Sequence, residues 1–332
     1  MPVFLGSILK KTAKVNAAMA IAFVFPGQGS QTVGMGKALA ANFAVARAVF
    51  DEVDSALGAK LSGIIFEGPA ETLTLTENAQ PALMAVSLAA MRVLESEAGL
   101  DLARDAKFVA GHSLGEYSAL AASGAFTLAD TARLLRTRGL AMQKAVPVGV
   151  GAMAALLGLE FEVASAVAVE AAQGEVCQAA NDNGAGQVVV SGNKAAVERA
   201  VEIAKAKGAK RAMLLPVSAP FHCALMQPAA AVMEEALANV HIKPPSVPVV
   251  ANVLAKPIRE PAEIARALVA QVTGTVRWRE SVAFMSDAGV QAFYEVGAGK
   301  VLSGLIKRIA EGVAANAIGT PEDVAAFKTA RA

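Results

Sequence analysis

The stretch from residue 107 to residue 123 constrains the fold more than any other part of the chain. Lys107 to Ala110 predicts a buried strand, and Gly111-His112-Ser113-Leu114-Gly115 follows it without a linker. From Leu114 to Ser123 the pattern is helical, and Gly124 suits the end of that helix. A strand that turns so abruptly into a helix is typical of layered α/β domains with a mostly parallel sheet.

The same alternation of strands and helices runs through most of the chain. Ala20 to Phe25 is an apolar run closed by Pro26-Gly27, which predicts a first core strand. Further strands are expected at 247–252 and 291–296, and helices at 34–57, 79–98, 130–143, 262–272, 278–288 and 301–310. We therefore predict an α/β core domain with a parallel sheet, made of residues 19–149 and 217–320.

A different order interrupts this alternation at residues 150–216. The pattern predicts strands at 152–159, 176–180, 187–191 and 211–215, and helices at 161–173 and 193–208. Residues 181–186 have strong turn chemistry, and Asn193 is expected to cap the second helix. The order β-α-β-β-α-β is that of a ferredoxin-like unit, so we predict an inserted small domain at 150–216.

The two ends of the chain stand apart from these domains. Lys10, Lys11 and Lys14 precede an apolar run, but Pro26-Gly27 follows that run where a signal peptide would have its cleavage site. Residues 1–18 are therefore predicted to be an N-terminal extension of unknown role. Residues 321–332 are predicted to be a C-terminal tail that forms a short surface helix.

The composition excludes several classes of partner. The 332 residues include 30 Lys and Arg and 29 Asp and Glu, a net charge of +1, which does not favour bulk binding to nucleic acid or to an anionic membrane. No apolar run reaches the roughly 18 to 20 residues of a membrane helix. Two cysteines, Cys177 and Cys223, are too few for a disulfide framework and favour reduced thiols in a cytoplasmic protein. No cluster of metal-ligand spacing is present, so no metal is expected.

Ser113 is the candidate nucleophile of an acyl-transfer reaction. Gly111 to Gly115 matches the G-x-S-x-G elbow, in which a serine hydroxyl projects from a sharp strand-to-helix turn. The N–H of Leu114, at the helix start, can donate to a developing oxyanion. The loop from Pro26 to Gln31 is a candidate for the second donor. It is not a dinucleotide-binding loop, because Thr32 stands where the third glycine of G-x-G-x-x-G belongs.

A serine nucleophile needs a base, and the chain offers three histidines. The side chain of His112 is expected to point away from the hydroxyl of its neighbour Ser113. His241 precedes Lys243-Pro244-Pro245 and is expected in a loop or at an edge. Elimination leaves His222, just after the last strand of the insert. No acid stands out as the third member of a triad, and a main-chain carbonyl is an alternative partner for His222.

Arg138 is placed on the apolar face of its predicted helix. At 100° per residue from Arg133, Arg138 falls at about 140°, within the arc of about 80° to 200° that leucine, alanine and methionine occupy. A buried guanidinium needs an anionic partner. That partner is either a carboxylate of the protein or a carboxylate of the substrate.

Five sequence blocks resemble those of malonyl-CoA:acyl carrier protein transacylases, over residues 19–320. The blocks are Pro26-Gly27-Gln28-Gly29-Ser30-Gln31, Gly111-His112-Ser113-Leu114-Gly115-Glu116-Tyr117, Arg138-Gly139, Ser218-Ala219-Pro220-Phe221-His222, and Tyr294-Glu295-Val296-Gly297 with Gly299-Lys300-Val301-Leu302. The resemblance implies a hydrolase-like α/β domain with a ferredoxin-like insert. It also implies a serine acyltransferase of fatty acid biosynthesis, although a discrete enzyme of polyketide synthesis stays open.

The resemblance assigns roles within the catalytic centre. Ser113 would be acylated, and His222 would be the base, oriented by the main-chain carbonyl at Gln271. The main-chain N–H groups of Gln28 and Leu114 would form the oxyanion hole.

The resemblance also implies the substrates. Arg138 would bind the malonyl carboxylate, and Phe221 would crowd an α-methyl group, with simple packing as the alternative role of Phe221. The donor would be malonyl-CoA and the acceptor the phosphopantetheine thiol of acyl carrier protein, without a cofactor, on a monomer. Two rival functions remain: a serine esterase or thioesterase, and a non-catalytic module that docks carrier proteins.

Overall fold

The computed structural model describes residues 19–331, so the predicted extension at 1–18 lies outside the described residues. Two sheets organise this part of the chain. The strands of the larger sheet are β1 (Ile21–Phe25), β2 (Ala106–Gly111), β7 (Val249–Ala251), β8 (Lys256–Ile258), β9 (Ala292–Val296) and β10 (Ala314–Ile318). Those of the smaller sheet are β3 (Gly151–Leu157), β4 (Cys177–Asp182), β5 (Gln187–Asn193) and β6 (Arg211–Leu214).

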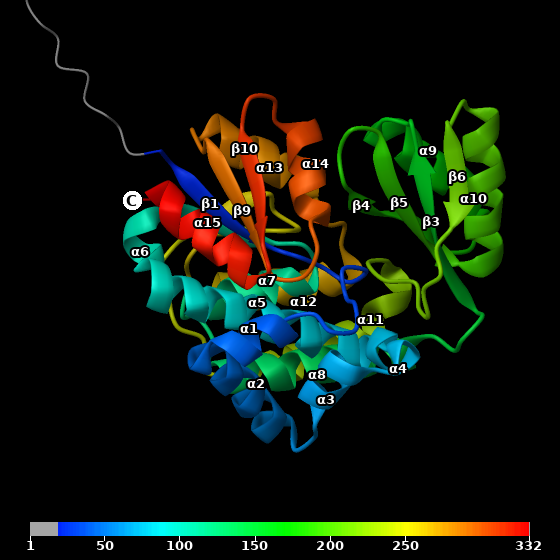
Figure 1. Ribbon diagram of the computed structural model, residues 1–332. Helices are drawn as coiled ribbons and strands as arrows, with labels where there is room; N and C mark the ends of the chain where they lie inside the picture. The colour runs from blue at the N-terminus through cyan, green and yellow to red at the C-terminus, as the bar shows by residue number, and fades with distance from the viewer. Residues whose placement is uncertain (1–18, 332) are drawn as a thin grey trace, which may run out of the picture.

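The larger sheet has the order β10-β9-β1-β2-β7-β8, and its neighbours are parallel except for the β7–β8 pair. The smaller sheet has the order β4-β5-β3-β6 and is antiparallel. Figure 1 shows the two sheets side by side above a layer of helices. A mixed α/β fold with a parallel-strand sheet and a separate antiparallel sheet confirms the predicted fold class.

Helices cover both faces of the larger sheet. They are α1 (Lys37–Asn42), α2 (Ala44–Leu57), α3 (Leu61–Glu67), α4 (Ala70–Thr74), α5 (Thr76–Ala98), α6 (Leu102–Asp105), α7 (Leu114–Ala122), α8 (Leu128–Ala145), α11 (Gln227–Ala238), α12 (Pro261–Thr273), α13 (Trp278–Asp287), α14 (Val301–Ile309) and α15 (Pro321–Arg331), with a short 3-10 turn at Ala224–Met226.

Strand β1 shows why this sheet is covered on both sides. Phe23 and Phe25 pack into one apolar cluster with residues of α5 and α7, while Ala22 and Val24 pack into another with residues of α13 and α14. Successive side chains of a strand point to opposite faces, so an uninterrupted apolar run requires two covered faces.

Two predicted helices have different limits in the structure. The helix predicted at 34–57 is divided into α1 and α2 by Phe43, whose backbone is extended at φ −128° and ψ 120°. The helix predicted at 79–98 begins earlier, at Thr76, and contains Pro81. Elements that the sequence reading missed include the short helices α3, α4 and α6, helix α11, and the strands β8 and β10.

The smaller sheet belongs to a segment with the order β3, α9 (Phe161–Ala172), β4, β5, α10 (Lys194–Ala206), β6. These elements lie within the predicted insert at 150–216. Asn193 occupies the N-cap position of α10, but its side chain accepts the N–H of Val176 instead of a helical N–H. The predicted side-chain cap at Asn193 is therefore wrong, because this side chain is hydrogen-bonded to the residue that precedes β4.

The last helix is part of the main body. Val324 and Phe327 of α15 are buried in the large apolar cluster, and Figure 1 shows α15 lying near β1 and β9. The surface helix predicted within residues 321–332 is present as α15, most of whose residues are exposed or half-exposed, and its two buried side chains anchor it to the core domain. Within residues 19–331, none of the helices has the length and apolar character needed to cross a membrane.

Candidate active site

Ser113 stands at the junction of β2 and α7 in a conformation that few non-glycine residues adopt, with φ 52° and ψ −111°. The flanking glycines make the turn possible. A Cβ on Gly111 would lie 1.9 Å from the carbonyl carbon of Gly115, and a Cβ on Gly115 would lie 2.2 Å from the oxygen of Phe25. The side chain of Asn252, after β7, holds the turn: its Oδ1 accepts the N–H of Ser113 at 2.7 Å and its Nδ2 donates to the oxygen of Gly111 at 2.7 Å.

The structure brings His222 and Ser113 together. His222 Nε2 lies 2.8 Å from Ser113 Oγ, and His222 Nδ1 lies 2.8 Å from the main-chain oxygen of Gln271. Because a carbonyl only accepts, Nδ1 carries the proton and Nε2 presents a lone pair to the serine hydroxyl. Burial, and then the positive charge of Arg138, lower the pKa of His222 to about 3, so the imidazole is neutral.

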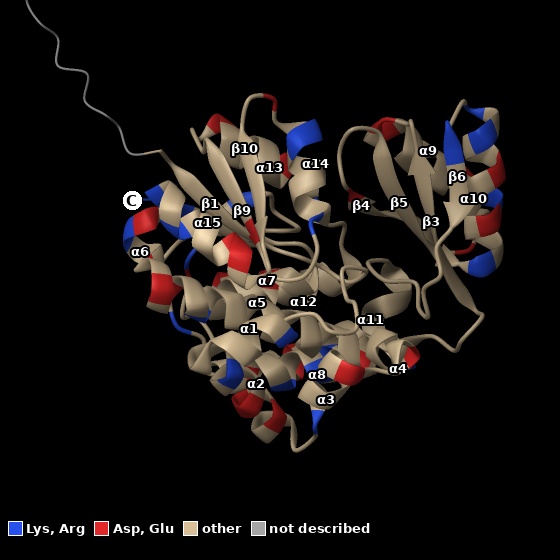
Figure 2. Cartoon of the chain, in the orientation of Figure 1, with Lys and Arg blue, Asp and Glu red and all other residues tan. Residues whose placement is uncertain are grey.

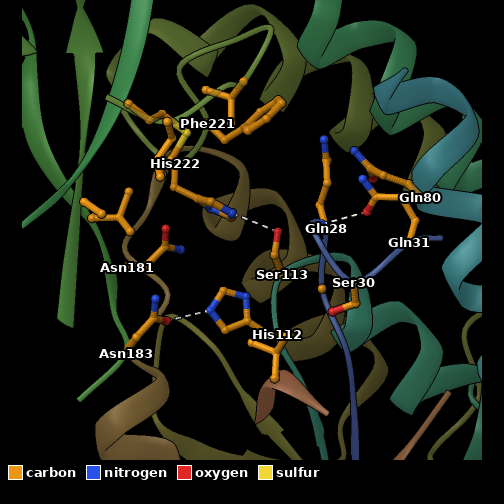
Figure 3. A pocket seen from close by; sticks show the side chains of 18 of the residues that line it. Gln28, Ser30, Gln31, Gln80, His112, Ser113, Asn181, Asn183, Phe221 and His222 are labelled. Carbon is orange, nitrogen blue, oxygen red and sulfur yellow. Dashed lines mark hydrogen bonds between the residues drawn. The ribbon is translucent and has the colours of Figure 1, made fainter. Parts of the chain in front are cut away.

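The other two histidines lie elsewhere. His112 is buried beside the elbow and directs Nε2 at Asn183 Oδ1, 2.9 Å away, as Figure 3 shows. Burial lowers the pKa of His112, so its ring is neutral as well. His241 is exposed in the coil after α11. His222 is thus the histidine within reach of Ser113 Oγ.

Arg138 projects from α8 into the same centre and is 1% exposed. Its Nη2 donates to Ser113 Oγ at 3.1 Å and to Gln271 Oε1 at 2.8 Å, while its Nη1 donates to Gln80 Oε1 at 2.8 Å. Among residues 19–331, no carboxylate forms an ion pair with it. Burial lowers the pKa of Arg138, and the nearby Tyr117 and Glu116 oppose this shift.

The N–H groups around the elbow define where an oxyanion can bind. Those of Ser113, Gly115 and Glu116 already donate, to Asn252 Oδ1 and to the main-chain oxygens of His112 and Ser113. At the first position of α7, the N–H of Leu114 has no acceptor within its own helix. Gln28, in the loop after β1, lies on the opposite side of Ser113 from Asn181 in Figure 3.

A cavity of about 470 Å³ opens over Ser113 between the two sheets. The core domain contributes Gln28, Ser113, Arg138, Phe221 and His222, and the small domain contributes Met153, Ala155, Asn181, Asn183 and Val189. One narrow polar centre within an apolar cleft suits a small polar group carried on a long arm. Residues 19–331 contain no group of three or more His, Cys, Asp or Glu side chains placed to hold a metal ion.

Sequence reasoning missed three polar residues of this centre. Asn252 clamps the elbow, the side-chain amide of Gln271 contacts Arg138, and Glu116 accepts from both Asn252 N and Gln271 Nε2. Only Glu116 left a signal in the sequence, as an acid in a helix start that is otherwise apolar or small. The side chains of Asn252 and Gln271 are brought in from more than a hundred residues away.

Comparison with known proteins agrees with this geometry. Residues 22–323 match the acyl transferase domain family. The chain is 48% identical over 305 residues to a malonyl CoA-acyl carrier protein transacylase of Escherichia coli K12, covering 92% of this chain and 97% of the relative.

Two solved structures are similar over nearly the whole chain. One is an acyl-carrier-protein-S-malonyltransferase from Bartonella henselae, with a TM-score of 0.92 and 58% identity, covering 94% of this chain and 99% of the other. The second is a malonyl-transacylase in complex with its type II PKS acyl-carrier protein, with a TM-score of 0.90 and 42% identity over 94% of this chain and 99% of the other.

Proposed function

This chain belongs to the malonyl CoA-acyl carrier protein transacylase family and is an acyltransferase, and on that premise we propose that it moves malonyl from malonyl-CoA to acyl carrier protein through an ester on Ser113. One observation carries the proposal. The buried guanidinium of Arg138 donates to Ser113 Oγ and forms no ion pair with a carboxylate of the described chain, so the nucleophile and a cation free to pair with a substrate carboxylate form one site. An acyl group with a free carboxylate can be attacked by Ser113 while its carboxylate pairs with Arg138.

In the first step, Ser113 Oγ attacks the thioester carbonyl and its proton moves to His222 Nε2. The negative charge that develops on the carbonyl oxygen is stabilised by the main-chain N–H groups of Leu114 and Gln28. The tetrahedral intermediate breaks at the C–S bond. Coenzyme A leaves as the thiol with the proton from His222, and malonyl remains on Ser113.

In the second step, the phosphopantetheine thiol of acyl carrier protein gives its proton to His222 and attacks the ester carbonyl. The C–O bond to Ser113 breaks, and Ser113 Oγ recovers the proton. The main-chain oxygen of Gln271 keeps His222 in the required tautomer in both steps, which is the role that an acid plays in a Ser-His-Asp triad.

Phe221 supports a preference for unsubstituted malonyl groups. Its side chain lines the cavity next to His222 and is 8% exposed, so it has little room to move. A methyl group on the α-carbon of the acyl chain would compete with this ring for space. We therefore expect malonyl-CoA to acylate Ser113 faster than methylmalonyl-CoA.

We also infer a place for the enzyme in the cell. A chain transferring malonyl to a discrete carrier protein serves fatty acid biosynthesis, acts in the cytoplasm, and works as a monomer without a cofactor. The cytoplasm is supported by two free, buried cysteines, Cys177 and Cys223. A cavity that draws its lining from both domains of a single chain supports the monomer.

The fate of the acyl group separates a transferase from a serine hydrolase. The protein is loaded with malonyl-CoA, freed of excess donor, and divided between buffer and holo acyl carrier protein. We expect intact-protein mass spectrometry to show a stable malonyl adduct in buffer and rapid discharge to the carrier protein. Equal rates of loss in both would mean that water is the acceptor, and Ser113→Ala is the control without an adduct.

A further inference from the structure

Glu116 is a buried acid that these transfer steps do not use. It lies in the first turn of α7, where the whole run 114–121 is buried, and it is 1% exposed. Its Oε2 accepts the N–H of Asn252 at 3.0 Å and Nε2 of Gln271 at 2.8 Å, whereas Oε1 has no partner within residues 19–331. A buried acid in these surroundings needs a compensating charge or a proton.

The side-chain amide of Gln271 connects this acid to the arginine. Gln271 Oε1 accepts from Arg138 Nη2 at 2.8 Å, and Gln271 Nε2 donates to Glu116 Oε2 and, at 3.0 Å, to the main-chain oxygen of Ser113. A flipped amide would set its NH2 group against the guanidinium and its oxygen against the acid. Arg138 and Glu116 therefore fix a single orientation of the residue whose main-chain oxygen holds His222.

We propose that Glu116 is a positioning residue that orients the Gln271 amide and balances the charge of Arg138 while the substrate-carboxylate site is empty. The inference rests on the proposed role of Arg138. A bound malonyl carboxylate brings a second negative charge to one guanidinium. Glu116 then takes up a proton from solvent on Oε1, the oxygen at which no existing hydrogen bond is broken.

The pKa of Glu116 is consistent with proton uptake by this residue when malonyl binds. Burial raises its pKa to about 7, opposed by hydrogen bonds from Asn252 and Gln271 and by the charge of Arg138. The pKa of Tyr117 is raised to about 12 and that of His222 lowered to about 3, so neither changes charge between about pH 6 and 8.

The remaining elements packed against α7 direct no charge at Glu116. Strands β1 and β7 carry no charged side chain, and the ring of His112, at the elbow, is shifted towards its neutral form. The other charged residues on β2, α5 and α8 are exposed or half-exposed: Lys107, Glu77, Arg92, Glu95, Glu97, Asp130, Arg133, Arg136 and Lys144.

Glu116→Gln separates charge from geometry, because its amide oxygen can still accept from Asn252 and Gln271. For the wild type we expect the KM for malonyl-CoA to rise with pH between 6 and 8, as Glu116 ionises and repels the substrate carboxylate. In Glu116→Gln the KM should lose this pH dependence and be about tenfold lower at pH 8, with the KM for acetyl-CoA unchanged. Asp54→Asn, which neutralises a buried acid hydrogen-bonded to Ser62 on α3, should match the wild type.

A second measurement does not depend on altering Glu116. Ser113→Ala protein binds malonyl-CoA without forming an ester, and calorimetry in buffers of different ionisation enthalpy counts protons. We expect uptake of about half a proton at pH 7 with malonyl-CoA and none with acetyl-CoA, which carries the same coenzyme A.

Different results would overturn the proposed role of Glu116 and the proposed role of Arg138. Equal proton counts for the two donors, or a wild-type pH dependence of KM in Glu116→Gln, would overturn the role of Glu116 alone, provided that Arg138→Ala still loses malonyl selectivity. If Arg138→Ala discriminates the donors as the wild type does, the proposed role of Arg138 fails and the role of Glu116 fails with it.

Discussion

At the scale of the residue, Arg138 distinguishes this centre from that of a general serine esterase. Its guanidinium donates to Ser113 Oγ, and its charge contributes to the low pKa of His222. The cation therefore acts on the nucleophile and on the base even before substrate arrives.

Replacement of Arg138 by alanine tests this selectivity. Loss of a charge-assisted pair with the malonyl carboxylate, worth about 3 kcal/mol, should lower kcat/KM for malonyl-CoA about 100-fold, with a much smaller effect on acetyl-CoA. The matched control is Arg136→Ala, which removes a half-buried arginine of the same helix that contacts Asn78. Equal losses for both donors would show that Arg138 has only a structural role.

The pH dependence of Ser113 reactivity tests the coupling between Arg138 and His222. A neutral sulfonyl fluoride reports on the serine without involving a carboxylate. Because the pKa of His222 is lowered to about 3, we expect the inactivation rate of the wild type to stay level as the pH falls from 7 to 5. In Arg138→Ala the loss of the neighbouring charge should raise the pKa of His222. The inactivation rate of this variant should therefore begin to fall at a higher pH than that of the wild type. A wild-type rate that halves near pH 6.5 would contradict the account.

Individual residues of the site could be predicted where the sequence carries a local signal. Ser113 follows from its strand–turn–helix context, His222 from elimination, and Arg138 from its place on an apolar helix face. The contacts made by the side chains of Asn252 and Gln271 could not be predicted in this way. They join segments that are distant in sequence: Asn252 follows β7, whose carboxyl end lies at the same edge of the sheet as that of β2, and Gln271 comes from helix α12.

At the scale of the element, the elbow depends on how closely β2 and α7 approach β1. Gly115 has no room for a side chain, since a Cβ would lie 2.2 Å from the oxygen of Phe25. This strand–turn–helix unit was predictable because its turn chemistry is local. The longer helices were predictable in existence but less so in their ends: α5 begins at Thr76, three residues before the predicted start.

A pair of glycine substitutions tests the elbow. Gly115→Ala should lower the free energy of unfolding by about 3 kcal/mol and abolish acylation of Ser113, because the backbone of β1 cannot give way. Gly304→Ala is the control, since Gly304 lies on an exposed helix face with no atom within 4 Å of an added Cβ, and it should stabilise the protein by about 0.5 to 1 kcal/mol. Denaturant titration measures both, and a folded, active Gly115→Ala would contradict the packing argument.

At the scale of the whole molecule, strand β4 fastens the small domain to the core domain. Asn181 forms a parallel bridge with Val276, and Asp182, which is 1% exposed, pairs with Arg279 at 2.8 Å. In the cartoon of Figure 2, few charged residues lie on the segments between the two lobes, whereas α10 carries several. Since both domains line the cavity, we expect these contacts along β4, the seam between the domains, to influence its width.

Arg279→Ala tests this seam. Asp182 would lose its cationic partner while remaining buried, and burial already raises its pKa. Because Arg279 itself is more than a third exposed, we expect a modest destabilisation of about 1 kcal/mol, with a several-fold higher KM for acyl carrier protein. Arg199→Ala removes a pair with Glu175 within the small domain and should leave that KM unchanged. Equal KM values for the two variants would show that the seam does not shape the cavity.

The most direct test of the central claim is a competition for Ser113. The protein is mixed with equal concentrations of malonyl-, methylmalonyl- and acetyl-CoA, and the adduct is identified by intact-protein and peptide mass spectrometry. The geometry of Ser113, Arg138 and Phe221 predicts a malonyl group on Ser113 as the dominant product. An adduct on another residue, or acetyl and malonyl adducts in equal amounts, would contradict it.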